Sequence, residues 1–95
     1  MKLYVIARRD LPPGHRAVQG MHALHTLVER CAYPSDTTLV FLETDALEDL
    51  HARLAAAGVP VAGWGEPYYG EGLTALAAGA EGASHVRGLP LALAR

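Results

Sequence analysis

Four segments of the chain carry nearly continuous apolar runs that are typical of buried strands. The first is 2–8, which reads KLYVIAR and is rich in β-branched and aromatic residues. Similar runs occupy 37–44 and 59–64, and a shorter one occupies 73–77. Continuous rather than alternating apolar character predicts strands that are covered on both faces, as in a sheet between layers of helices.

Between the first two runs, from about His15 to Cys31, the pattern changes to that of an amphipathic helix. Apolar residues recur every three or four positions and form one stripe. The stripe consists of Ala17, Met21, Leu24, Val28 and Cys31. We therefore expect this stripe to face the sheet.

A second helix is predicted after the second strand. Asp45 and Glu48 have the spacing of a capping box, in which each side chain bonds a backbone N–H at the start of a helix. Four apolar residues then share one face, namely Leu47, Leu50, Leu54 and Ala57. Gly58 is a natural stop for this helix.

The order of these elements is strand, helix, strand, helix, strand, strand. Two strand–helix–strand crossovers imply right-handed connections and parallel pairing of the first three strands. The fourth strand follows the third too closely for a crossover, so we expect it to run antiparallel. A short helix at 81–87 and an apolar tail at 89–93 are expected to pack on the body. The predicted fold is a three-layer α/β/α domain over 1–95, with a mixed, mostly parallel sheet of about four strands.

Composition supports a single globular domain. The chain has 95 residues, of which 51% are hydrophobic, and this fraction excludes intrinsic disorder. No apolar run approaches the roughly 20 residues that a membrane-spanning helix needs, and the N-terminus has no signal-peptide pattern. The single cysteine, Cys31, excludes an internal disulfide and a cysteine-based zinc site. We expect a soluble, cytoplasmic protein with no membrane partner.

The charge balance argues against a protein that binds nucleic acid over a wide surface. Eight Lys and Arg residues stand against ten Asp and Glu residues, for a net charge of −2. A local exception is predicted, because ligands of open α/β sheets collect at the carboxyl ends of the parallel strands. Arg8 and Arg9 end the first strand there, and Arg16 lies in the first turn of the helix, whose N-terminus adds partial positive charge. We expect these three arginines to form a cationic corner beside Glu66 and Trp64, at the end of the third strand.

A polar face of the first helix carries candidate chemistry. His15, Gln19, His22, Thr26 and Glu29 fall within an arc of about 80°, opposite the apolar stripe. This face is either solvated or, at His15, Gln19 and His22, able to position a small polar group. Imidazoles also suit general acid–base catalysis near neutral pH. Two histidines three positions apart are too little for a metal site, so no metal is expected.

The chain lacks the sequence patterns of several common enzymes. It has no Walker-type phosphate loop, no G-x-S-x-G elbow and no Rossmann fingerprint. These absences exclude P-loop nucleotide triphosphatases, α/β-hydrolases and the common dinucleotide-dependent enzymes. Trp64, at the end of the third strand, fits core packing and a stacking surface equally well.

Two segments carry residues that occur together in one known family. A hydrophobic strand is followed by RRDL at 8–11 and GHRAVQGMHA at 14–23. Later, a strand reaches Glu66 and is followed by a glycine-containing loop and TALA at 74–77. The chain thereby resembles the type-2 peptidyl-tRNA hydrolases over most of its length, with tighter loops than typical members. Their first segment reads approximately R-x-D-L and G-K-x-x-x-Q-x-x-H-A.

The resemblance implies an α/β/α fold with a mixed sheet, frequent dimers, and hydrolysis of the ester between a peptide and the 3′ ribose of tRNA without a cofactor. Gln19 and His22 match family positions. Glu66 falls at the position of the family's Asp, with Glu71 as the alternative, and Thr74 is the candidate for its Thr. His15 stands where the family has a functional Lys, which leaves open whether catalysis is retained.

The first hypothesis is a peptidyl-tRNA hydrolase-like enzyme that cleaves the peptidyl or aminoacyl ester of tRNA. In this enzyme His15 polarises or protonates, Glu66 orients water, and Gln19 holds the carbonyl or the terminal ribose, with Thr74 in the same catalytic set. Substrate binding is expected of Arg8, Arg9, Arg16 and His22. The alternative is a catalytically silent homologue that binds RNA ends or a protein partner. In either case a homodimer is expected.

Overall fold

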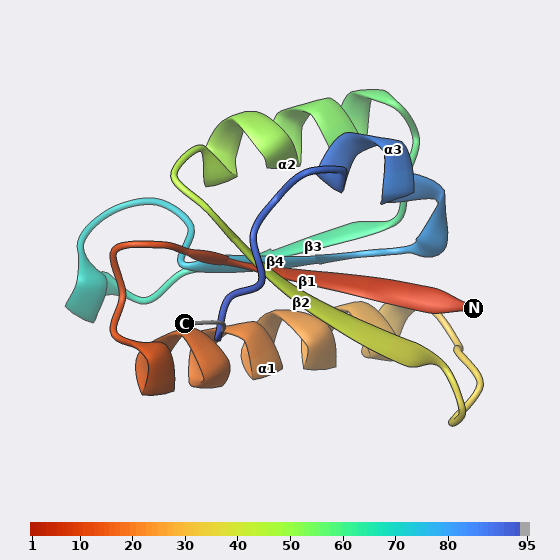
Figure 1. Cartoon of the computed structure of the whole chain (residues 1–95), viewed down its shortest axis with the longest axis horizontal. Coiled ribbons are helices and arrows are strands. Elements are labelled where there is room, and N and C mark those ends of the chain that lie inside the picture. Colours follow the sequence, from red (N-terminus) through yellow and green to blue (C-terminus); the bar gives the residue numbers. More distant parts are fainter. Residues whose placement is uncertain (94–95) are drawn as a thin grey trace.

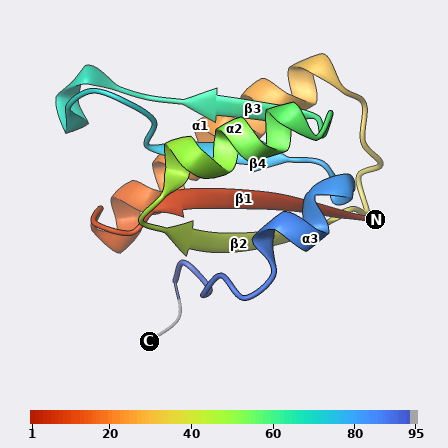
Figure 2. The ribbon, with the colours of Figure 1, turned by 90° about the horizontal axis from the view of Figure 1, so that it is seen from above.

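Four strands form one mixed sheet in this computed structural model, which describes residues 1–93 (Figure 1). They are β1 (Lys2–Arg8), β2 (Thr38–Thr44), β3 (Val61–Trp64) and β4 (Ala75–Ala78). Across the sheet they stand in the order β2–β1–β4–β3 (Figure 2). The bounds of β1 are those that the sequence predicts, and the other three strands fall on the other three apolar runs.

The pairing of the strands differs in one respect from the predicted sheet. β1 pairs with β2 in parallel along its whole length, and β4 runs antiparallel to both β1 and β3. β3 points the same way as β1 and β2, but β4 lies between them, so the expected parallel pairing is wrong for β3. Burial explains the order: all four residues of β4 are buried. Such a short apolar strand gains most at the centre of the sheet, where helices cover both of its faces.

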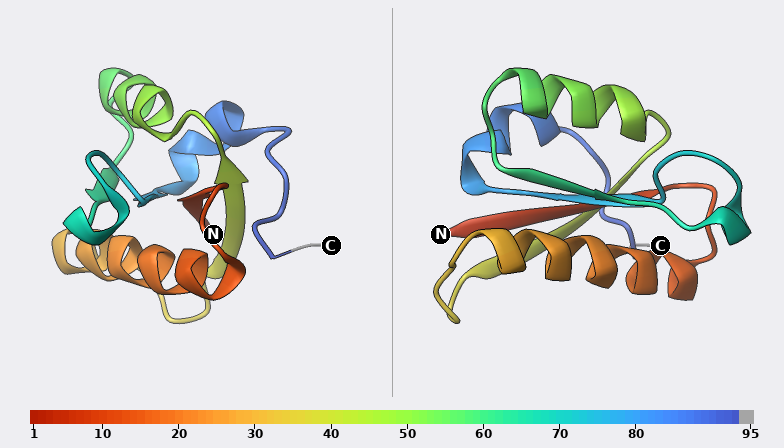
Figure 3. Two further views of the ribbon diagram at one scale, coloured as in Figure 1. Left: turned by 90° about the vertical axis from the view of Figure 1, so that its left-hand side faces the viewer. Right: turned by 180° about the vertical axis from the view of Figure 1, so that it is seen from behind.

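Helices cover both faces of the sheet, which confirms the three-layer prediction. α1 (Pro13–Arg30) packs on one face, while α2 (Leu47–Ala56) and α3 (Ala83–Val86) pack on the other (Figure 1 and Figure 3). Two apolar cores result. The core under α2 includes Ile6, Leu50, Leu54 and Leu76, and the core above α1 includes Leu3, Val5, Ala23 and Leu27.

The helix α1 presents a different face to the sheet from the one that its apolar stripe predicts. Its buried residues are Gln19, Gly20, Ala23 and Leu27. Met21 and Val28 are exposed instead, so the sheet-facing stripe is displaced by one residue, about 100° around the helix. Close packing accounts for this orientation, because a Cβ at Gly20 would lie 3.0 Å from side-chain carbons of Val5 and Phe41.

The start of α2 is not built by the predicted capping box. Its N-cap residue is Ala46, whose N–H donates to Thr44 Oγ1 at 3.2 Å, and neither Asp45 nor Glu48 caps the helix. The Glu48 carboxylate instead bonds the connection between β3 and β4. The predicted stop is confirmed, because Gly58 has a φ of +74°, a left-handed conformation that favours glycine after a helix.

The segment after α3 lies along the outer edge of β2, as predicted for an apolar tail (Figure 2). Glu43 N–H donates to Pro90 O at 2.9 Å, and Ala92 N–H donates to Phe41 O at 3.0 Å. The tail thereby pairs with part of a strand edge that would otherwise expose backbone donors and acceptors.

Candidate functional site

Three side chains on successive turns of α1 face the connection between β3 and β4, which contains the short 3-10 turn η1 (Pro67–Tyr69). His15 Nδ1 lies 2.6 Å from the hydroxyl oxygen of Tyr69. Gln19 and His22 contact residues at the end of β3. The part of the polar face of α1 that carries His15, Gln19 and His22 therefore contacts β3 and the β3–β4 connection and is not merely solvated.

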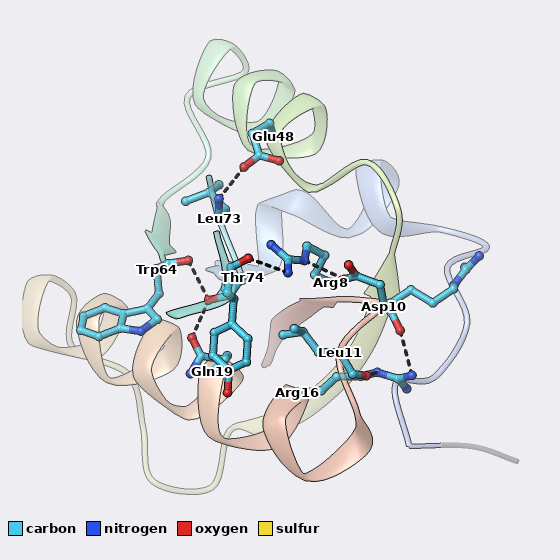
Figure 4. Close-up of polar contacts among 11 residues, drawn as sticks. Arg8, Asp10, Leu11, Arg16, Gln19, Glu48, Trp64, Leu73 and Thr74 are labelled. Atoms are coloured by element: carbon cyan, nitrogen blue, oxygen red, sulfur yellow. Dashed lines mark hydrogen bonds and ion pairs between the residues drawn. The ribbon is translucent and has the colours of Figure 1, made fainter. Parts of the chain in front are cut away.

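A chain of hydrogen bonds runs from Thr74, just before β4, through Gln19 of α1 to Glu66, just after β3; its link between Thr74 and Gln19 is drawn in Figure 4. Thr74 Oγ1 donates to Gln19 Oε1 at 2.6 Å, and Gln19 Nε2 donates to Glu66 Oε1 at 3.0 Å. Thr74 and Gln19 are 0% and 1% exposed. Because both ends of the Gln19 amide are occupied inside the protein, Gln19 holds Glu66 in place and is not free to contact a ligand.

The Glu66 carboxylate is the centre of this cluster. Its Oε1 also accepts a hydrogen bond from Trp64 Nε1 at 3.4 Å, and His22 Nε2 lies 3.7 Å away. The hydrogen bonds from Gln19 and then from Trp64 lower the pKa of Glu66; burial partly opposes them, and the charge of His22 adds a further lowering. The Glu66 side chain is 35% exposed. An ionised carboxylate is thus held in a fixed position where solvent reaches it.

The rings of His22 and Trp64 are stacked. Their centres are 4.4 Å apart and their planes are 8° from parallel. Trp64 is half-buried and the His22 side chain is 45% exposed, so the imidazole lies at the surface with one face covered by the indole. This stack fixes the plane of the imidazole beside Glu66.

A cavity of about 420 Å³ opens beside Glu66 within the β3–β4 connection. It is lined by Gly65, Glu66, Pro67, Gly70, Glu71 and Gly72. Gly65 is required by close approach, because a Cβ there would lie 2.5 Å from Gly72 O. The cavity leaves the carboxylate open to solvent.

The β3–β4 connection is tied to the rest of the domain at two points. Arg8 Nη2 donates to the backbone carbonyl of Tyr69 at 3.2 Å, and the Glu48 carboxylate accepts the N–H of Leu73 (Figure 4). Tyr68, before the first of these points, is 82% exposed. The connection therefore holds an exposed aromatic ring next in sequence to the cavity residue Pro67.

The arginines of the predicted cationic corner are paired with carboxylates of the protein, and among the described contacts neither Arg9 nor Arg16 reaches Glu66 or Trp64. Arg8 pairs with Asp10 at 2.6 Å, and Arg9 pairs with Asp45 at 2.8 Å and with Glu43 at 3.5 Å. The Arg8 side chain is 22% exposed to solvent and the Arg9 side chain is 43% exposed. Any anion that binds here competes with the protein's own carboxylates.

Arg16 has a different position from the other two arginines. Its guanidinium donates to three backbone carbonyls: Leu11 O at 2.7 Å, Arg9 O at 2.9 Å and Ala92 O at 2.5 Å. It also lies 2.9 Å from Glu43 Oε2. Arg16 therefore joins the β1–α1 loop to the tail, and these bonds occupy the donors that the sequence assigns to phosphate.

Four of the predicted site residues form one cluster, namely Gln19, His22, Glu66 and Thr74. His15 and Arg8 lie next to it, since both contact Tyr69. Arg9 and Arg16 lie instead around Glu43, on the side of the tail. The alternative carboxylate Glu71 lines the cavity, whereas Glu66 both lines it and contacts Gln19.

Sequence reasoning left Trp64 undecided and missed Tyr69 and Glu48. A signal for Trp64 was present, because residues two apart in an extended segment point to the same side, which places Trp64 beside Glu66. Tyr69 and Glu48 carry no such signal, since each contacts an element that is distant in the sequence.

Comparison with known proteins gives no relative from which a role can be assigned: neither a protein-family model nor a curated protein matches the chain. Within residues 1–93, no group of three or more His, Cys, Asp or Glu side chains is arranged to hold a metal ion. Among the helices of that same part of the chain, none combines the length and apolar character needed to cross a bilayer. Functional assignment therefore depends on the geometry of the site.

Proposed function

We propose that this protein hydrolyses the ester that links a peptide or an amino acid to the 3′ ribose of tRNA, as type-2 peptidyl-tRNA hydrolases do. The observation that carries the proposal is the state of Glu66. Its carboxylate has a lowered pKa, is fixed by two N–H donors and lines a cavity. A carboxylate in this state orients an attacking water by accepting one of its hydrogen bonds.

The two oxygens of Glu66 have separate roles in this proposal. Oε1 accepts the bonds from Gln19 and Trp64. Within the described residues no hydrogen bond is made to Oε2, which leaves it for the water. Gln19 and Thr74 then act as positioning residues, because their bonds set the direction in which the carboxylate points.

The negative charge that develops on the ester oxygen requires a compensating donor. Arg8 contacts the backbone carbonyl of Tyr69 and His15 contacts its hydroxyl, both on the loop that bounds the cavity, and both side chains keep part of their surface exposed. His15 occupies the position of the family's Lys, and its protonated form supplies the same sign of charge. These two groups are our candidates for that stabilisation.

A single-stranded 3′ end suits the surroundings of the cavity. Aromatic side chains stack unpaired bases without sequence preference, and Tyr68, next to the cavity residue Pro67, is 82% exposed with its ring edge-to-face against Tyr69. The ion-paired state of Arg8 and Arg9 limits the electrostatic contribution to RNA affinity. We therefore expect weak binding that depends on the terminal nucleotide as well as on the backbone.

The proposal is tested by release of a labelled N-acetyl-aminoacyl group from tRNA by the purified protein. Glu66→Gln should lower the rate by about 10²-fold or more, the usual scale for a positioned acid or base. The same change at Glu71 decides between the two candidate carboxylates. Asp36→Asn, in an exposed turn far from the cavity, should leave the rate unchanged. No release by the wild-type protein would rule out the proposed function.

The alternative is a silent homologue that binds RNA ends or a protein partner. It is favoured by one contact, the bond between His15 Nδ1 and the Tyr69 hydroxyl, because the group at the family's Lys position is already engaged. His15→Lys separates the two functions. A rise in ester hydrolysis identifies a weakened hydrolase, whereas RNA binding that persists without any hydrolysis identifies a binding module.

A further inference from the structure

The stacked pair of His22 and Trp64 has a geometry that a structural contact alone does not require. His22 lies on the third turn of the polar face of α1, and Trp64 lies at the end of β3. The indole covers one face of the imidazole, and His22 Nε2 lies 3.7 Å from Glu66 Oε1, within ion-pair distance but beyond a hydrogen bond. The stack sets the plane of the ring, and Nε2 is the ring nitrogen that lies beside Glu66.

The carboxylate beside Nε2 favours one placement of the proton in the neutral His22 ring. A carboxylate beside Nε2 favours the tautomer with N–H on that nitrogen, which leaves the lone pair on Nδ1. Within residues 1–93, no hydrogen bond is made to His22 Nδ1, and the side chain is 45% exposed. A carboxylate that orients an imidazole whose second nitrogen is free is the arrangement of carboxylate–histidine pairs in hydrolases.

We propose that His22 is the proton carrier of the reaction, with Glu66 as its orienting partner and Trp64 as its support. The inference rests on the proposed hydrolase function. It assigns to His22 a role that the sequence gave to His15, and Glu66 then acts on the water through His22 instead of by direct contact. Nδ1 takes a proton from a water molecule as the water oxygen forms a bond to the ester carbonyl carbon. When the bond from that carbon to the ribose oxygen breaks, Nδ1 returns the proton to the leaving oxygen. The products are a carboxylic acid and a free ribose hydroxyl.

Among the described residues, Glu66 is the charged group that contacts the His22 ring. On α1, His25 pairs with Glu29 at 3.2 Å on the exposed side, and Arg30 reaches Val61 O at 3.5 Å. From β3 and the connection after it, Trp64 and Glu66 face the ring. The uncharged Thr26 bonds the backbone carbonyl of His22. A change in the charge of His22 therefore acts mainly on the two groups that contact its ring, Glu66 and Trp64.

The first measurement is the pH profile of ester hydrolysis. With neutral His22 as the base, the wild-type rate should rise with pH across the range in which imidazoles lose their proton, about pH 5 to 8. His22→Gln should lower kcat by about 10²-fold, leave KM nearly unchanged and remove this rise. His25→Gln, one turn away on the exposed side of α1, should keep both the rate and the profile.

The second measurement needs no substrate. Trp64 is the single tryptophan of the chain, so its fluorescence reports directly on the stacked imidazole. A protonated imidazole quenches indole emission because it accepts an electron from the excited ring. Emission should therefore rise with pH in the wild type and in His25→Gln, at the same midpoint as the rate, and show no such step in His22→Gln.

The outcomes separate the inference from the function on which it rests. If the wild type hydrolyses the ester and His22→Gln does so equally well, the inference is overturned and the hydrolase stands. If the hydrolysis rate of both the wild type and His22→Gln falls as pH rises, the inference about His22 is also overturned. That result assigns the proton-dependent step to His15. If the wild type hydrolyses nothing, both fail together. Rescue of His22→Ala by added imidazole supports proton transfer and argues against a purely structural role.

Discussion

Thr74 Oγ1 donates a hydrogen bond of 2.6 Å to Gln19 Oε1, and this bond decides which end of the Gln19 amide faces Glu66. A carboxylate accepts hydrogen bonds and cannot donate them when ionised, so Gln19 must turn its NH₂ group toward Glu66. Its oxygen then needs a donor inside the protein, and the Thr74 hydroxyl is that donor. Thr74, the residue before β4, thereby controls the state of the Glu66 carboxylate, two residues after the end of β3.

Replacing Thr74 by Val should destabilise the protein by about 1–3 kcal/mol, because the buried Gln19 oxygen loses its donor while the shape of the side chain is kept. Unfolding in urea measures the effect. Thr38→Val is the matched control, since Thr38 is exposed on β2, and its effect should stay within about 0.5 kcal/mol. Equal effects of the two substitutions would contradict the proposed chain of bonds.

Glu66 should make stability depend on acid pH. Because its pKa is lowered in the folded state, its contribution is present above the unfolded value of about 4.3 and is lost as pH falls through the folded value. The wild type should therefore lose more stability between pH 7 and pH 3 than Glu66→Gln does. Urea midpoints at several pH values measure this difference, and Glu71→Gln should follow the wild type.

Arg16→Lys should lower the free energy of unfolding by about 2 kcal/mol, because a single ammonium group cannot reach the three carbonyls that the guanidinium joins. Hydrogen exchange should also show faster exchange at Ala92 N–H, where the tail pairs with β2. The control is Arg53→Lys, an exposed residue paired only along α2 with Asp49, for which we expect at most about 0.5 kcal/mol. Unchanged protection of the tail in Arg16→Lys would assign its docking to apolar contacts alone.

RNA affinity should rise when the carboxylates around the arginines are removed. Asp10→Asn frees Arg8, and Asp45→Asn releases Arg9 from its nearest partner. Each new phosphate contact should steepen the slope of log affinity against log salt by about 0.7 for single-stranded RNA. Salt titrations with a short 3′ fragment of tRNA measure the slope, with Asp36→Asn as the control. Affinity that does not change in the double variant would place RNA binding elsewhere.

We expect the predicted homodimer to form through the exposed apolar face of α1, which the sequence had predicted to face the sheet. Met21 and Val28 are exposed on it, and an apolar cavity of about 180 Å³ beside it includes Leu39 and Leu93 in its lining. Met21→Glu should convert a dimer to a monomer at micromolar concentration, since it buries a charge in an apolar contact. Sedimentation velocity measures the mass. Arg53→Glu, on the opposite layer, should leave it unchanged, and a monomeric wild type would refute the dimer.

Local patterns predicted the elements well. β1 has the predicted bounds, and α1 begins two residues before the expected His15 and ends one residue before Cys31. Both depend on interactions between neighbours in the chain, namely strand propensity, helical periodicity and helix-stopping residues. The predicted capping box was wrong because the Glu48 carboxylate accepts the N–H of Leu73, in the connection between β3 and β4, and does not bond the start of α2.

The sequence predicted which residues form the candidate site better than it predicted the contacts that those residues make. The sequence identified Gln19, His22, Glu66 and Thr74 through the family resemblance, and the structure brings them into one cluster. It did not reveal that Gln19 and Thr74 are buried, nor that Arg16 is bound to backbone carbonyls. The bonds of Gln19 join it to Glu66, 47 positions away, and to Thr74, 55 positions away, and one of the Arg16 bonds reaches Ala92, 76 positions away.

The sequence by itself determined the strands, the helices, their order and the α/β class, because hydrophobic periodicity and turn residues act over a few positions. Only the tertiary structure decided that β4 lies between β1 and β3 and that α1 turns its glycine and alanine, not its methionine and valine, toward the sheet. Both choices follow from close packing: small side chains allow a helix and a sheet to approach, and that gain outweighs the burial of a wider apolar stripe. The same rotation carries Gln19 and His22 to Glu66, so packing of the core also set the geometry of the site.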